Sequence, residues 1–221
     1  MATPKLIQYL STFSAQEVAA MQDFAGGDYF CPRKELRRLL HYLLEQWPDF
    51  PVPACGKARM YQVAYPDNAY DDKLLRYLLS DACRLVELFW GVARYQQDLQ
   101  QRQLDLLKEF SMRDLHKMYE SKCREAARQK TSRAFIEPEA YKSDYDWAAA
   151  EEDYFLRRRQ RNFNFQIETA SRALDRFYYF QQLAYACGMI ERQNILEGVY
   201  VLTFTEHWLK HLEEKDFFND A

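Results

Sequence analysis

Apolar residues recur at helical spacing along most of the chain, and residues that form tight turns are scarce. Only 6 Gly and 7 Pro occur among the 221 residues, whereas an all-β fold needs many tight turns. Strict alternation of apolar and polar side chains, which a half-buried strand would show, is confined to residues 198–203 at most. The hydrophobic share of 48% is enough to build a packed core. The sequence therefore predicts an all-α protein of roughly eight to ten helices.

The stretch that looks most central to the fold is residues 168–195. Its apolar side chains recur at helical spacing, and the aromatic run at residues 177–180 points in every direction around a helical turn. A helix that is apolar nearly all round has to be buried on several sides. We therefore expect other helices to pack around this segment and the fold to be organised on it.

The helical pattern divides the chain into two predicted regions. Residues 1–95 form an N-terminal helical cluster, which includes a long helix that starts after the acidic residues 71–72. Residues 96–221 form helix pairs, one of them capped by residues 111–114, with short connections that suggest tetratricopeptide-like stacking, whose period is about 34 residues. The tryptophan, glycine and proline positions of that repeat are not reproduced here. A single continuous domain is the alternative.

Charge and cysteine content favour a cytoplasmic protein. The net charge of −3 and the isoelectric point near 5.9 give no overall attraction to nucleic acid or to an anionic membrane. No apolar run reaches the length of a membrane span, and we expect no membrane partner. The five cysteines are far apart and never form a CxxC pair, which indicates reduced thiols. They are Cys31, Cys55, Cys83, Cys123 and Cys187.

The densest basic cluster provides the candidate binding site. It consists of Arg157, Arg158, Arg159 and Arg161, and Tyr154 lies one turn before it. Arginines beside aromatic residues suit the binding of RNA or of a phosphorylated segment. The simpler interpretation is structural, because cations favour a helix C-terminus and pair with acidic residues one turn earlier. We take these five residues as the candidate contact surface for a protein or peptide partner.

A second interpretation concerns residues 39–88. Their three expected helices are similar to the winged helix of activator-type regulators, in which the third helix enters the major groove through exposed basic residues. Here Lys73, Arg76 and Arg84 are offset by neighbouring acidic residues, and no hairpin wing is expected after the third helix. The sequence thus allows a helix-turn-helix shape but lacks the basic footprint of a DNA-binding surface.

Catalytic and metal-binding motifs are missing from the sequence. It contains no GxSxG motif, P-loop or dinucleotide fingerprint. His207 and His211 have the spacing of metal ligands on one helix, yet no glutamate follows the first histidine as in HExxH, and exposed histidines are the commoner case. Cys83 and Cys187 lie on apolar stripes and are interpreted as core thiols. We expect a noncatalytic protein without a metal or cofactor.

Several short stretches resemble an uncharacterised family of helical proteins from Bacteroidetes. The matching stretches are residues 5–10, 28–30, 57–66, 70–81 and 174–196. They follow the order of the chain and are mainly core-forming. The sequence departs from the family pattern at residues 26–28, where Ser-Pro is expected, and at Gly188, where an acidic residue is expected. The resemblance implies an intracellular helical protein with further helices after this chain, and it supplies no catalytic residue.

These observations favour a noncatalytic adaptor or assembly factor. Stacked helix pairs expose grooves that take peptides or partner helices, which makes a protein or peptide the expected partner. The alternative is a transcriptional regulator that contacts nucleic acid through residues 39–88.

Overall fold

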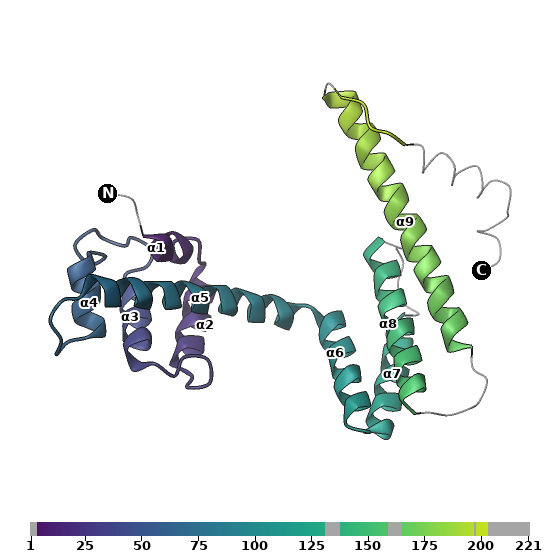
Figure 1. Ribbon diagram of the computed structural model, residues 1–221, viewed down its shortest axis with the longest axis horizontal. Coiled ribbons are helices and arrows are strands. Elements are labelled where there is room, and N and C mark those ends of the chain that lie inside the picture. The colour runs from purple at the N-terminus through teal and green to yellow at the C-terminus, as the bar shows by residue number, and fades with distance from the viewer. Residues whose placement is uncertain (1–3, 131–137, 159–164, 197, 203–221) are drawn as a thin grey trace. The chain divides into compact units, whose positions relative to one another are not determined.

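The computed structural model is all-helical (Figure 1). It describes residues 4–130, 138–158, 165–196 and 198–202, and these contain nine helices and no strand. The prediction of an all-α protein is confirmed. The possible strand at residues 198–203 is not formed, since its described part, residues 198–202, has no regular secondary structure. None of the helices described is long and apolar enough to cross a membrane.

The chain divides into two compact units, Met1–Asp98 and Leu99–Ala221. The helices of unit 1 are α1 (Lys5–Leu10), α2 (Ala15–Gly26), α3 (Lys34–Leu44), α4 (Lys57–Ala64) and α5 (Asp72–Gln97). The helices of unit 2 are α6 (Leu99–Met112), α7 (His116–Lys130), α8 (Pro138–Arg157) and α9 (Gln166–Ile195). Tetratricopeptide-like stacking of these helices stays a prediction.

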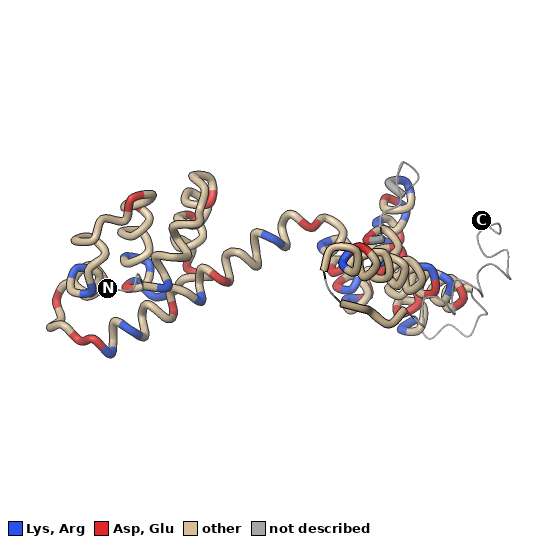
Figure 2. The backbone as a smooth tube through the Cα atoms, turned by 90° about the horizontal axis from the view of Figure 1, so that it is seen from above, with Lys and Arg blue, Asp and Glu red and all other residues tan. Residues whose placement is uncertain are grey.

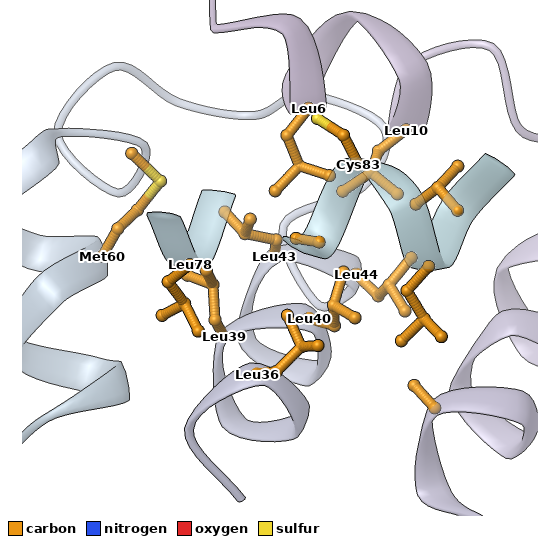
Figure 3. Close-up of a cluster of buried hydrophobic side chains, with 14 of the residues drawn as sticks. Leu6, Leu10, Leu36, Leu39, Leu40, Leu43, Leu44, Met60, Leu78 and Cys83 are labelled. Carbon is orange, nitrogen blue, oxygen red and sulfur yellow. The ribbon is translucent and has the colours of Figure 1, made fainter. Parts of the chain in front are cut away.

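Helix α5 is the element around which unit 1 is built. It is 26 residues long and packs against α1, α2, α3 and α4. Its buried side chains are Leu75, Leu78, Ala82, Cys83, Leu85, Val86 and Phe89. The facing side of α3 carries a stripe of buried leucines, namely Leu36, Leu39, Leu40, Leu43 and Leu44 (Figure 3). The core of unit 1 therefore lies where the stripes of α3 and α5 meet.

Local signals in the sequence fix where two helices of unit 1, α2 and α5, begin. Ser14 and Glu17 form a reciprocal capping box at the start of α2. The carboxylate of Asp71 accepts hydrogen bonds from the backbone N–H groups of Lys73 and Leu74, which caps α5. Because these caps satisfy N–H groups that have no partner within the helix, they stop each helix from extending toward the N-terminus.

Unit 2 has a smaller buried cluster formed by α6, α7 and α8. Its members are Leu104, Leu107, Tyr119, Ala126, Trp147, Ala150 and Tyr154. The most extensive helix pair of the described chain is α8 with α9. Tyr141 stacks on Phe180 at 3.9 Å between ring centroids, and Tyr145 lies parallel to Phe177 at 6.4 Å. This reversed order of pairs means that α8 and α9 run antiparallel.

The expectation that α9 is buried on several sides is wrong for the described residues. Ala186 is its one buried residue, and Leu174, Tyr178 and Tyr185 are exposed. The described helix that covers α9 to any large extent is α8. Half of the aromatic run, Phe177 and Phe180, faces Tyr145 and Tyr141 of α8. In unit 1 the organising role belongs to α5, which packs against α1, α2, α3 and α4.

A tight turn joins α6 to α7. Asp114 has a left-handed backbone (φ 56°), the N–H of Leu115 donates to Phe110 O at 2.9 Å, and the N–H of Asp114 donates to Ser111 O at 3.4 Å. These two bonds define a Schellman motif with Asp114 in the position that glycine usually takes. Ser111 thus lies inside the last turn of α6 and does not start a new helix, so the predicted cap at residues 111–114 is wrong.

Candidate functional site

Unit 2 contains a cleft that includes one of the predicted arginines and the predicted tyrosine. It has a volume of about 450 Å³, which lies within the roughly 300–1,000 Å³ range of ligand sites. We call it the Tyr154 cleft. It is lined by Tyr119, Glu120, Cys123, Arg124, Glu151, Tyr154, Phe155, Arg158 and Gln166. Aromatic side chains form its wall, and charged groups of both signs surround it.

Tyr154 on α8 is held from α7 by two contacts. Its ring stacks on the ring of Tyr119, with centroids 3.7 Å apart and planes 9° from parallel. Its hydroxyl lies 3.0 Å from Nδ1 of His116. The Tyr119 hydroxyl in turn donates to the backbone carbonyl of Ala150, one turn before Tyr154, at 3.1 Å. These contacts fix the position of the wall, because neither ring can rotate without losing its stack or its hydrogen bond.

The structure describes two of the four predicted arginines, and these two differ in their contacts. Arg158 lies 5.6 Å from the Tyr154 ring centroid and 3.8 Å from a carboxylate oxygen of Glu120 on α7. Its ion pair is therefore made to another helix and not to the acidic residues one turn earlier. Arg157 is exposed, and the described part of the chain holds no ion-pair partner for it. Arg159 and Arg161 lie outside the described residues.

Cys123 lines the cleft, and its surroundings favour the protonated thiol. Burial is the largest cause that raises the pKa of its thiol to about 11, and the nearby carboxylate of Glu151 acts in the same direction. Since the thiolate is the reactive form, only about one molecule in a thousand would be reactive at pH 8. Burial likewise raises the pKa of Tyr154, an effect that the adjacent Arg158 opposes.

The raised pKa of Cys123 and the exposure of Cys187 give a testable prediction about thiol reactivity. At pH 8 iodoacetamide should alkylate the exposed Cys187 at least about tenfold faster than Cys123, because Cys123 is protonated and partly covered. Peptide mass spectrometry of timed samples measures both rates in the same molecule. Comparable rates at the two residues would show that the pKa of Cys123 is not raised. The exposure of Cys187 also corrects its interpretation as a core thiol, whereas Cys83 is buried as expected.

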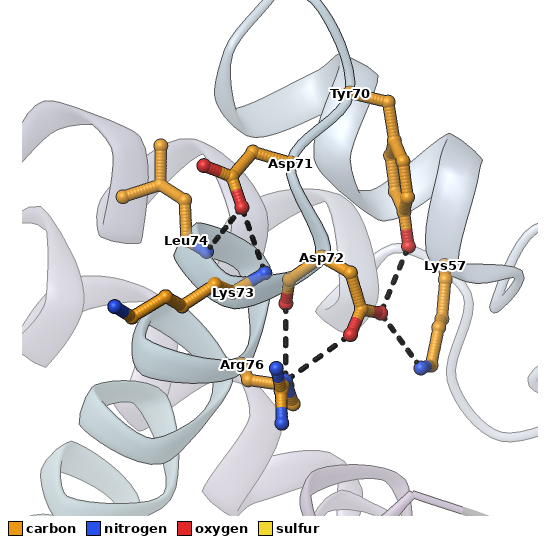
Figure 4. Close-up of polar contacts among 7 residues, drawn as sticks. All are labelled: Lys57, Tyr70, Asp71, Asp72, Lys73, Leu74 and Arg76. Carbon is orange, nitrogen blue, oxygen red and sulfur yellow. Dashed lines mark hydrogen bonds and ion pairs between the residues drawn. The ribbon is translucent and has the colours of Figure 1, made fainter.

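The helices of the winged-helix interpretation are α3, α4 and α5, and two of the three basic residues noted on α5, Arg76 and Arg84, form ion pairs. Lys57 and Arg76 both pair with Asp72, at 2.8 and 3.1 Å, and the Tyr70 hydroxyl donates to the same carboxylate at 3.1 Å (Figure 4). Arg84 pairs with Asp81 at 3.3 Å. Acidic and basic positions are interleaved along α5 (Figure 2). These ion pairs offset part of the positive charge with which α4 and α5 could attract a phosphate backbone.

Neither metal ligands nor related proteins give a further indication of what the site does. No group of three or more His, Cys, Asp or Glu side chains suited to a metal occurs among the residues described, and His207 and His211 lie outside them. The chain matches no protein-family model, no curated protein and no solved structure. The resemblance to a Bacteroidetes family stays a prediction.

The structure adds residues to the site that the sequence did not single out. Tyr119, Glu120 and Cys123 lie on one face of α7, and His116 lies one turn before them. The signal present in the sequence was their spacing of three and four residues, which places them on the same side of a helix as a polar and aromatic stripe. Nothing in that spacing indicates that α8 is the helix they face.

Proposed function

We propose that unit 2 is a noncatalytic protein-interaction module that binds a short segment of a partner protein in the Tyr154 cleft. The observation that carries this proposal is a preformed aromatic wall, made by the stacked Tyr119 and Tyr154 beside Phe155, within a rim of both charge signs. An apolar, aromatic centre with a polar rim is the usual composition of a protein interface.

The volume of the cleft limits how much of a partner protein can enter it. A volume of about 450 Å³ holds one or two large side chains of a segment and not the face of a folded domain. Tyrosine and arginine are the residues that most often dominate binding energy at interfaces, and Tyr154 and Arg158 are adjacent here at 5.6 Å. We therefore expect a partner segment that inserts an apolar side chain against the wall.

The test is co-purification of the full chain from its native cell with matched charge reversals. Reversing both described cluster residues (Arg157→Glu with Arg158→Glu) should reduce recovery of a stoichiometric partner by about tenfold or more, because a repulsive charge then borders the cleft. The control reverses two exposed arginines outside the cleft, Arg113→Glu with Arg192→Glu, and should leave recovery within about twofold. Equal recovery with both variants would reject the Tyr154 cleft as the contact surface.

Nuclease treatment in the same experiment separates the alternative. The proposal that residues 39–88 contact nucleic acid predicts that the co-purified material is lost on nuclease treatment and that retention on duplex DNA falls steeply with salt. The ion pairs of Asp72 with Lys57 and Arg76 weigh against that alternative. A partner that survives nuclease and responds to the Arg157 and Arg158 reversal supports the protein-interaction proposal.

A further inference from the structure

A second pocket shares Tyr154 and Arg158 with the Tyr154 cleft and is lined almost entirely by polar groups. Its volume is about 330 Å³, and we call it the polar pocket. Its lining residues are Ser111, Asp114, His116, Tyr154, Arg157 and Arg158. We infer that the polar pocket is an anion subsite that takes a phosphate or carboxylate group of the segment bound in the Tyr154 cleft. This inference rests on the proposed function and specifies the partner's chemistry.

The hydrogen-bond donors of the polar pocket come from three separate elements. Arg157 ends α8 and Arg158 follows it, His116 begins α7, and Ser111 lies in the last turn of α6. Two guanidinium groups supply donors in the geometry that phosphate and carboxylate oxygens accept. The hydroxyl of Ser111 adds a further donor. This set of donors, gathered at one cavity, is suited to a compact anion and not to an apolar group.

His116 and the end of α7 strengthen the same preference. The Tyr154 hydroxyl engages Nδ1 of His116 at 3.0 Å, which leaves Nε2 as the ring nitrogen for a ligand. The half-buried His116 is also the first residue of a 15-residue helix. The N–H groups in the first turn of a helix lack intrahelical acceptors and carry partial positive charge, which favours a nearby anion.

The charge balance of the polar pocket is positive although it contains one acid. Arg157 has no ion-pair partner among the described residues. Arg158 forms an ion pair with Glu120 at the long distance of 3.8 Å. The acid is Asp114, whose left-handed backbone closes the Schellman motif. Asp is one of the few non-glycine residues that adopt this conformation readily. Its presence is therefore explained by the turn and does not require a role for its charge in the pocket.

The two pockets share Tyr154 and Arg158, and this sharing sets the order of groups in the ligand. An apolar side chain that rests on the aromatic wall places its neighbouring residue beside the polar pocket. The partner segment should accordingly carry a phosphorylated or acidic residue next to an apolar one.

The test uses phenyl phosphate, which joins an aromatic ring to a dianion, and inorganic phosphate, each titrated into the full chain at constant ionic strength. NMR signals of the His116 backbone N–H and the arginine Nε–H groups should shift and saturate. Arg157→Gln should weaken binding about tenfold, because one charge-assisted hydrogen-bonding group is lost. Asp114→Asn keeps a residue that tolerates the left-handed turn and should tighten binding about threefold, since a like charge is removed. The control Arg113→Gln should change neither.

Several outcomes would overturn the inference that the polar pocket is an anion subsite. These are shifts that never saturate, an effect of Arg113→Gln equal to that of Arg157→Gln, or no tightening with Asp114→Asn. A short single-stranded RNA that displaces phenyl phosphate better than a phosphoserine peptide would overturn the assignment to a protein segment. If the partner still responds to the Arg157 and Arg158 reversal while no phosphate binds, the subsite fails and the proposed function stands. If phosphate binds as expected but no partner protein is recovered, the proposed function fails.

Discussion

Leu78→Ala should lower the free energy of unfolding of unit 1 by about 2–5 kcal/mol, the range of large-to-small changes in a close-packed core. Leu78 is fully buried on α5, the helix that α1, α2, α3 and α4 all contact. It lies among the leucines of the neighbouring helix α3 (Figure 3). The loss is large because removing three carbon atoms there leaves a cavity that four helices would have to shift to fill.

The same helix offers a matched control for this substitution. Leu88 is 46% exposed on α5, and Leu88→Ala should change the free energy of unfolding by less than about 0.5 kcal/mol. Urea unfolding followed by hydrogen exchange in peptides from α5 measures both variants on the same segment. If both leucines cost equally, helix propensity and not burial would account for the effect, and α5 would not be the organising element.

The parts of unit 1 that the sequence predicts well are those governed by neighbours in the chain. The capping box of Ser14 and Glu17 and the cap of Asp71 each involve residues no more than three positions apart. The leucine stripe of α3 follows from helical periodicity alone, since an 11-residue helix with five leucines on one face has one way to bury them. Rules of this range need no knowledge of the rest of the fold.

Helix α9 shows where such rules stop being sufficient. Its existence and its bounds at Gln166–Ile195 follow the predicted segment closely, yet its burial does not. Periodicity tells which side chains share a face but not which faces another helix covers. Phe177 and Phe180 are covered by α8, whereas Leu174 and Tyr178 are exposed. That difference depends on which helix packs alongside, and the α9 segment does not encode it.

The residues of the candidate site likewise include some that the sequence indicates and some that it does not. Tyr154 and Arg158 were identifiable because the basic cluster is contiguous in the chain. His116 meets Tyr154 across 38 residues of sequence, and the turn at Asp114 is what brings the start of α7 there. A left-handed aspartate in place of glycine carries no strong sequence signal. The sequence therefore predicts that Ser111 starts the next helix, whereas it lies in the last turn of α6.

Tyr119→Ala should be the most damaging single change in unit 2, with a loss of about 3–5 kcal/mol in the free energy of unfolding, as for other large aromatic residues removed from a core. Tyr119 is 3% exposed, and its ring provides the surface on which Tyr154 stacks. Tyr119→Phe keeps the ring and removes only the hydroxyl that donates to Ala150 O. Its loss should be about 1 kcal/mol. Tyr185→Ala, at a tyrosine 62% exposed on α9, is the control and should cost less than about 0.5 kcal/mol.

The pH dependence of unfolding separates burial of the hydroxyl from burial of the ring. Burial raises the pKa of Tyr119 above its ordinary value of about 10. The folded state therefore keeps a proton that the unfolded state loses, and unit 2 should lose stability as the pH rises above about 10. Urea unfolding of unit 2 at pH 8 and pH 10.5 should show this loss in the wild type and a smaller loss in Tyr119→Phe, which cannot ionise. Cys123, with its pKa raised to about 11, also adds to the alkaline loss, and the Tyr119 hydroxyl lowers that pKa through a hydrogen bond. Both proteins are therefore compared in a Cys123→Ala background, which removes this contribution. An equal loss in the two would mean that the Tyr119 hydroxyl ionises as freely as in water, and the stacked wall of the cleft would then have to be open to solvent.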